Sequence, residues 1–322
     1  MGLFRTDTEL TASKTATTAA PRPARLQRRT RTPAHRSGWP FVVPAVLLLL
    51  VLNVFPLIFS IAMSFSNVST ENGLRLTSST LANWGQLLHD SDFWASLRFT
   101  AFFVVLAVAG EFVFGLALAL LLWRKIPGGG LFRVLFTIPM MVAPVAIGFI
   151  FRMIFNEQYG PVDSILRSLH LPNVLWLSST GTAPYSVVIM DIWQWTPLMF
   201  LLLLAGLQAI PEDAMEAARI DGASGLRVIR DIVFPLLAPI SVMAVFLRMI
   251  LAFTIFGEIY LLTGGGPGTS TTSTTLFAYY QGFQNFNLSY GSTISLALLI
   301  FVTATGLLYL AVTRLLLRRV AT

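Results

Sequence analysis

Four ionisable side chains interrupt long apolar stretches of this sequence, at Glu111, Asp191, Arg248 and Glu258. A charged group inside a membrane costs about 2.5–3.5 kcal/mol on insertion scales, so it usually faces a cavity or a partner group. Aromatic faces beside amides and carboxylates suit a hydroxyl-rich sugar, because CH groups stack on rings while hydroxyls form hydrogen bonds. We therefore predict a substrate pathway. Its candidate residues are Glu111, Asp191, Trp193, Gln194, Trp195, Arg248, Glu258 and Tyr260.

A purely structural interpretation of the same residues stays open. The ionisable groups would then form ion pairs between helices, or lie near the membrane surface. The tryptophans of the run D-I-W-Q-W-T-P would belong to the aromatic belt at the membrane interface. Residue type and spacing do not choose between these two interpretations.

A polar stretch from Pro211 to Pro235 separates two of the apolar stretches and reads P-E-D-A-M-E-A-A-R-I-D-G-A-S-G-L-R-V-I-R-D-I-V-F-P. Proline followed by two acids suits the start of a helix. Gly222 permits a sharp turn, Ser224 can cap a second short helix, and Pro235 is expected to end that helix. The stretch predicts a helix-turn-helix on a membrane surface, with its turn presented to solution.

The composition is that of a membrane protein. Of 322 residues, 55% are hydrophobic and only 11% are charged, whereas soluble domains average about 25% charged. The chain has no cysteine and three widely separated histidines, so we expect no disulfide and no metal site. The net charge of +7 comes from arginines concentrated in loops and termini, which membrane topology explains.

Six apolar stretches each exceed the ~20 residues that a helix needs to cross a membrane. We therefore predict an all-α polytopic fold with six transmembrane helices and the helix-turn-helix between the fourth and the fifth. A polar loop over 155–183 is expected to hold a short helix near 162–169, and 263–291 is expected to be a loop. The predicted spans are Phe41–Phe65, Leu97–Trp123, Leu131–Ile154, Tyr185–Leu207, Leu236–Leu262 and Ser292–Leu316.

Basic residues set the predicted topology. Residues 1–40 are expected to be a disordered basic tail, 41–316 the transmembrane domain with its loop at 211–235, and 317–322 the C-terminal end. The arginines of the tail, Arg124-Lys125 and Arg318-Arg319 all fall on one side of six spans. Because basic loops stay inside, both termini and the polar stretch are predicted to be cytoplasmic.

The polar stretch also carries a pattern of known spacing: E-A-A, three residues, Gly, nine residues, Ile, one residue, Phe-Pro. It resembles the signature loop of binding-protein-dependent ABC importer permeases, which usually ends in Leu-Pro. The resemblance implies a coupling helix that docks on a separate ATPase subunit; an ordinary cytoplasmic loop is the alternative. The residues carried over are Glu216, Ala217, Ala218, Gly222, Ile232 and Pro235.

Two further runs, L-A-N-W-G-Q-L-L-H-D-S-D-F-W-A-S-L-R-F-T and F-G-E-I-Y-L-L-T-G-G-G-P-G-T, resemble the carbohydrate-importer branch of these permeases. That branch implies a second permease subunit, ABC ATPase subunits and an extracytoplasmic solute-binding protein in the bacterial cytoplasmic membrane, surrounded by lipid. It implies import of a di- or oligosaccharide or a polyol, and no nucleic-acid partner. The sequence has no G-x-x-x-x-G-K-[S/T], the pattern of an ATP-binding P-loop, so we expect no cofactor on this chain. ATP and Mg are expected to bind to the partner ATPase.

Three other functions were weighed. An ion-coupled secondary transporter would use Glu111, Asp191 or Glu258 as proton-linked groups, but no duplication of the two halves is evident. A membrane scaffold without transport activity is a further alternative. An enzyme is the least favoured, because no paired carboxylate, catalytic triad or metal cluster stands out in the sequence.

Overall fold

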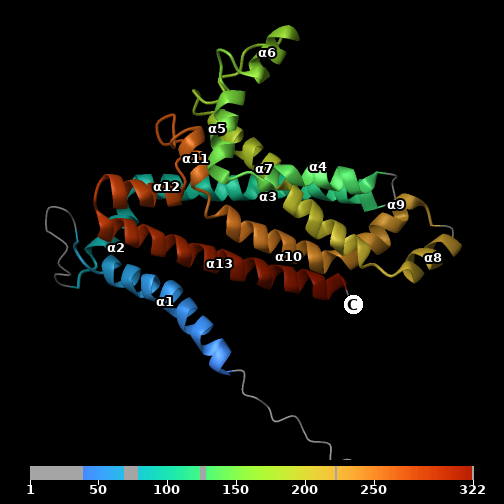
Figure 1. Ribbon diagram of the computed structural model, residues 1–322, viewed down its shortest axis with the longest axis horizontal. Helices are drawn as coiled ribbons and strands as arrows, with labels where there is room; N and C mark the ends of the chain where they lie inside the picture. The colour runs from blue at the N-terminus through green and yellow to red at the C-terminus, as the bar shows by residue number, and fades with distance from the viewer. Residues whose placement is uncertain (1–38, 69–78, 124–127, 222, 321–322) are drawn as a thin grey trace, which may run out of the picture. The chain divides into compact units, whose positions relative to one another are not determined.

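Helices form every regular element in the described part of the chain, as expected for an all-α protein. The computed structural model describes residues 39–68, 79–123, 128–221 and 223–320. Residues 1–50 and 51–322 form two separate units, and the arrangement below is that of residues 51–322 (Figure 1). The predicted tail up to Gly38, the basic pair Arg124-Lys125 and Gly222 lie outside the described residues.

Five helices are long and apolar enough to cross a membrane by length and composition. They correspond to the first, second, fourth, fifth and sixth predicted spans. Ahead of the fifth predicted span, two short helical segments over 225–233 lead into the helix without a break. The five are α1 Trp39–Ser64, α3 Ser91–Trp123, α7 Ala183–Gln208, α10 Phe234–Ala252 and α13 Leu288–Val320.

The third predicted span is a broken one. It consists of α4 Gly129–Met141 and α5 Pro144–Ile154, which are bent by 95° relative to one another. Val142 and Ala143 between them are extended, with ψ of 136° and 135°. Proline disfavours a helical conformation at the preceding residue, so Pro144 both breaks the span and starts the next helix.

The fifth predicted span, Leu236–Leu262, is longer than the helix in the structure. Helix α10 stops at Ala252, and a separate short helix, α11 Gly257–Leu262, follows after four residues. Side-chain hydroxyls stabilise this break, because Ser273 and Thr275 both donate hydrogen bonds to the carbonyl of Ile255. Irregular backbone at membrane depth needs such replacement partners, and residues so distant in sequence could not be foreseen from the apolar stretch alone.

The predicted helix-turn-helix is present, but its second helix does not end at Pro235. Helix α8 Glu212–Ile220 is the first helix of the pair. After the turn, α9 Gly225–Val228, the π-helical turn η1 Ile229–Val233 and α10 follow without a break and form one span from Gly225 to Ala252. In η1 the amide of Phe234 bonds to the carbonyl of Ile229, five residues back. This shift of hydrogen-bond register lies just before Pro235, which has no N–H to contribute, and the helix continues past it.

Four short elements complete the described chain. Helix α6 confirms the short helix predicted near 162–169. Two elements occupy 274–284, where a loop was predicted. The side chain of Ser273 caps the first of them by accepting the amide of Leu276. The elements are α2 Ala82–His89, α6 Pro161–Ser168, α12 Thr274–Tyr279 and η2 Tyr280–Gln284.

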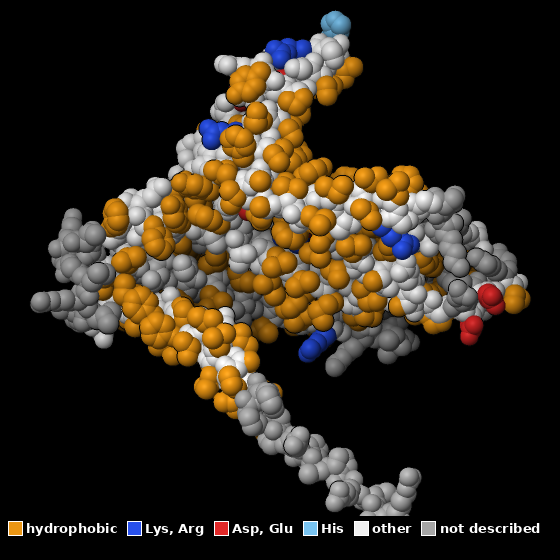
Figure 2. All heavy atoms as spheres, in the orientation of Figure 1, with side chains coloured by type: hydrophobic (Ala, Val, Ile, Leu, Met, Phe, Trp, Pro, Cys, Tyr) orange, Lys and Arg blue, Asp and Glu red, His pale blue; other side chains and the backbone are white. Residues whose placement is uncertain are grey.

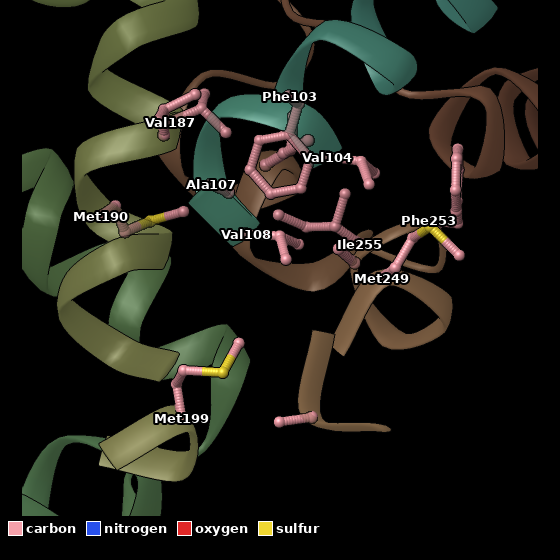
Figure 3. Packing of buried hydrophobic residues seen from close by; sticks show 14 of the residues in the cluster. Phe103, Val104, Ala107, Val108, Val187, Met190, Met199, Met249, Phe253 and Ile255 are labelled. Atoms are coloured by element: carbon pink, nitrogen blue, oxygen red, sulfur yellow. The ribbon is translucent and has the colours of Figure 1, made fainter. Parts of the chain in front are cut away.

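The core lies where α3 packs along α7, with α10 against both. Figure 3 shows side chains of α3, among them Phe103 and Ala107, facing Val187 and Met190 of α7. Gly115 of α3 allows the close approach, because a Cβ there would lie 2.9 Å from the Cβ of Met199. Small residues at helix contacts are typical of membrane bundles.

Polar segments occupy the ends of the bundle. Along its long axis, α8, α9 and the C-terminal end of α13 lie at one end, and α2 and α12 lie at the other (Figure 1). On the face in Figure 2, hydrophobic side chains spread over the helices, whereas basic side chains lie near α5 and α6 and at separate places along the bundle, and acidic side chains lie near α8. This distribution is that expected for helices that cross a membrane.

Candidate functional site

A buried charge cluster links the three central helices. Arg248 of α10 lies with its Nε 2.8 Å from Glu111 Oε2 of α3, and an Nη atom donates a hydrogen bond to Asp191 of α7. All three side chains are at most 3% exposed. Removing such charges from water is costly, and the close pairing offsets that cost. The ion pairing between helices that the structural interpretation predicts is present for Glu111, Asp191 and Arg248.

The cluster contains more acid than base. One guanidinium faces the carboxyl groups of Glu111 and Asp191, and its carbon lies 5.0 Å from the centre of the Trp195 ring. Two carboxylates and an aromatic face therefore surround Arg248. A cation over an indole ring is attracted by the π electrons, which adds to the ion pairs in holding the side chain in place.

Asp191 and Arg248 of this cluster form one wall of a cavity of about 220 Å³, which we call the inner cavity. It lies where the broken spans turn: Pro144 begins α5 there, and α10 gives way to α11. Gly148 of α5 packs against the backbone of Glu258, where an added Cβ would be 2.5 Å from the carbonyl oxygen. The cavity is lined by Pro144, Asp191, Trp195, Arg248, Leu251, Thr254, Ile255, Phe256, Gly257 and Glu258.

The structure brings four of the eight sequence-predicted pathway residues to this cavity: Asp191, Trp195, Arg248 and Glu258. Glu111 pairs with Arg248 but does not line the cavity.

The other three do not line it. Trp193 is 46% exposed and packs edge-on against Phe151. Gln194 is buried with its amide 3.5 Å from the carbonyl of Val142. Tyr260 is 39% exposed and stacks on Phe256.

Sequence reasoning missed the residues of the break between α10 and α11, namely Thr254, Phe256 and Gly257. A threonine and a glycine close to Glu258 at the end of an apolar stretch were the available signal. Without knowledge of the break they look like ordinary members of a span.

The surface turn between α7 and α10 exposes its apolar tip. Ile220 at the end of α8 is 87% exposed and Leu226 in α9 is 78% exposed. The amide of Ala223 bonds to the carbonyl of Ala218, five residues back, which satisfies one of the carbonyl groups at the end of α8. Large apolar side chains this exposed on a polar segment are typical of a contact surface.

The residues carried over from the family pattern occupy different positions on this turn. Glu216 and Pro235 are exposed, Ala218 is buried, and Ile232 is half-buried in η1. Ala217 lies on α8 between Glu216 and Ala218. Gly222 lies outside the described residues.

Residues 111–322 match the family described as "Binding-protein-dependent transport system inner membrane component". The probable ABC transporter permease protein y4oQ of Sinorhizobium fredii is 37% identical over 280 residues, which are 87% of this chain and 90% of that protein. The trehalose/maltose transport system permease protein MalF of Thermococcus litoralis is 40% identical over 235 residues, 73% of this chain and 79% of that protein.

The fold has a solved counterpart. A bacterial ABC transporter involved in the import of the acidic polysaccharide alginate superposes with a TM-score of 0.73 at 19% identity, over 88% of this chain and 96% of that one. At this identity the likeness concerns the fold alone.

Proposed function

The chain belongs to the family of binding-protein-dependent transport system inner membrane components, and we propose that it is the permease subunit of an ATP-driven importer of a di- or oligosaccharide or a polyol. The observation that carries this proposal is the exposed surface turn of α8 and α9 between two membrane-spanning helices. Ile220 and Leu226 at its tip are large apolar side chains exposed to solvent, and a groove on a separate subunit would bury them.

The substrate class rests on the relatives and on the inner cavity. Two relatives are named for trehalose or maltose transport. The inner cavity offers the indole of Trp195, the ring of Phe256 and the carboxyl of Glu258. Rings and hydrogen-bonding groups in this combination suit the two kinds of surface that a sugar presents.

The energy source and partners follow from what the sequence lacks. With no P-loop of its own, the chain would rely on ABC ATPase subunits that hold ATP and Mg. We further propose a second permease subunit, an extracytoplasmic solute-binding protein, and a position in the bacterial cytoplasmic membrane with both termini in the cytoplasm.

The mechanism we propose uses the continuous helix from Gly225 to Ala252 as the connecting element. When ATP closes the ATPase pair, the turn at Glu216 to Gly222 moves with it, and α9, η1 and α10 transmit the shift to Arg248 and the inner cavity. Packed, rigid elements convert small displacements into discrete rearrangements of this kind. The cavity would then open alternately to the two sides of the membrane.

Ion-coupled secondary transport is the less favoured function, because the family and the relatives are those of ABC transporter permeases. Glu111 and Asp191, two of its three proton-linked candidates, are both engaged by Arg248.

The test is to purify the chain gently from its own membrane, identify the subunits that come with it, and reconstitute the complex in liposomes. Trehalose, maltose, maltotriose, glycerol and sorbitol are then screened, with the binding protein present, for stimulation of ATP hydrolysis and for uptake. We expect a P-loop ATPase in the complex and stimulation by at least one sugar. A purified chain that never associates with an ATPase would overturn the proposal.

A further inference from the structure

Five aromatic side chains run in contact from the inner cavity toward the end of the bundle that carries α12. The ring of Phe256 lies 5.2 Å from that of Tyr279 and 5.8 Å from that of Tyr260, and Tyr279 lies 5.7 Å from Phe283. These distances lie within the range of attractive aromatic pairs. We call this set the aromatic ladder; its members are Phe256, Tyr260, Tyr279, Tyr280 and Phe283.

The aromatic ladder joins two cavities. Phe256 lines the inner cavity, whereas Tyr279 and Phe283 line a second one of about 290 Å³, which we call the outer cavity. Four hydroxyl side chains and two glycines contribute to the outer cavity. They are Ser60, Thr275, Ser292, Ser295, Gly282 and Gly291.

The backbone is arranged to keep the outer cavity in place. Gly282 of η2 and Gly291 of α13 touch, since a Cβ on Gly291 would lie 2.8 Å from the Cα of Gly282. The hydroxyl of Tyr280 donates to the carbonyl of Gly264 at 2.8 Å, which ties η2 to the loop after α11. Burial, together with the neighbouring tyrosines, raises the pKa of Tyr280, so this hydroxyl keeps its proton at neutral pH.

Two features separate the ladder from ordinary core packing. Phe283 is 64% exposed and Tyr260 is 39% exposed, so parts of the ladder face open space. Four serine and threonine side chains are among the ten residues that line the outer cavity beside them, and lipid chains do not require such hydroxyls. Rings next to hydroxyl groups form the kind of surface to which a pyranose binds, with its CH face on a ring and its hydroxyls bonded at the edge.

We propose that the aromatic ladder and the outer cavity form a second saccharide-binding site on this chain, from which sugar passes along the rings to the inner cavity. The inference rests on the proposed function and adds a site and a route to it. Each cavity is at or below roughly 300 Å³, the lower end for ligand pockets, so each receives a single sugar ring at a time.

The test compares Phe283→Leu and Tyr260→Leu with Phe283→Tyr in the reconstituted complex with its binding protein. Leucine keeps apolar contact but removes the ring face, whereas tyrosine retains the face. For the sugar that best stimulates the wild-type complex, we expect both leucine variants to lower the uptake rate at subsaturating sugar about 2- to 10-fold. Phe283→Tyr should transport like wild type.

Phe286→Ala is the matched control, because Phe286 is 57% exposed, three residues from Phe283, and outside the ladder. Its uptake, and the amounts of copurified subunits in every variant, should equal those of wild type. Wild-type uptake in both leucine variants would overturn the ladder while leaving the proposed function intact. Loss of the second permease from the leucine variants would instead make this surface a subunit contact, and a wild-type complex that no sugar stimulates would overturn the proposed function itself.

Discussion

At the scale of single residues, Arg248 is the one that links the three central helices by ion pairs in the described part of the chain. It is the shared partner of two buried carboxyl groups from α3 and α7. Removing it leaves both acids unpaired at the centre of the bundle, with Glu111 fully buried and Asp191 at the wall of the inner cavity. Replacing all three charged groups at once creates no such imbalance.

We therefore expect Arg248→Met to lower the free energy of unfolding by about 3–5 kcal/mol. The triple variant Glu111→Gln, Asp191→Asn, Arg248→Met should recover most of that loss. Thermal unfolding followed by size-exclusion chromatography in detergent measures both. An Arg248→Met variant as stable as wild type would show that the cluster contributes little to the fold.

At the scale of elements, the contact between α5 and α11 sets the shape of the inner cavity. Helix α5 follows the break after α4, and α11 follows the break after α10. The two helices pack closely because Gly148 has no side chain. A side chain there collides with backbone, which cannot move aside as a flexible side chain can. The helix carrying Glu258 would have to shift.

We expect Gly148→Ala to reduce sugar uptake several-fold, since overpacking at a close contact costs about 1–3 kcal/mol and displaces α11. Gly130→Ala is the control, because a Cβ at Gly130 meets no atom within 4 Å. Uptake and basal ATP hydrolysis are measured for both. Equal uptake in the two variants would show that transport does not depend on the close contact between α5 and α11.

The surface turn of α8 and α9 is the second element with a separable role. Ile220→Asp and Leu226→Asp should leave insertion and thermal stability unchanged, because both side chains are already exposed. Each should reduce copurification of the ATPase and abolish uptake, since a charge would be buried unpaired in the contact. Leu81→Asp, at a 69% exposed position beside α2, is the control. Gly222→Asp is expected to abolish uptake in the same way.

At the scale of the whole molecule, topology is the property on which the proposed coupling depends. The chain contains no cysteine, so single-cysteine reporters need no background substitution. We expect a membrane-impermeant maleimide to label Ser168→Cys in α6 on intact cells, and to label Ser224→Cys beside α9 only after permeabilisation. Both positions are exposed in the structure. Labelling of Ser224→Cys on intact cells would place the turn outside and contradict an ATPase contact.

From the sequence alone came the class of the fold, the number of apolar stretches, the polar turn with its spacing pattern and three ionisable groups within spans, Glu111, Asp191 and Arg248. These follow from hydropathy and local backbone preference, which act within about twenty residues along the chain.

Only the tertiary structure decided which charges pair, where α10 ends and which residues share a cavity. Arg248 pairs with Glu111 and Asp191, which lie 137 and 57 residues before it in the sequence. The hydroxyls of Ser273 and Thr275 donate hydrogen bonds to the carbonyl of Ile255 at the break after α10. Contacts of this kind depend on how helices are placed in space, and periodicity along one segment carries no information about its neighbour's rotation or depth. The same limit explains why Tyr260 was predicted for the substrate pathway while its ring partners Phe256 and Tyr279 were not.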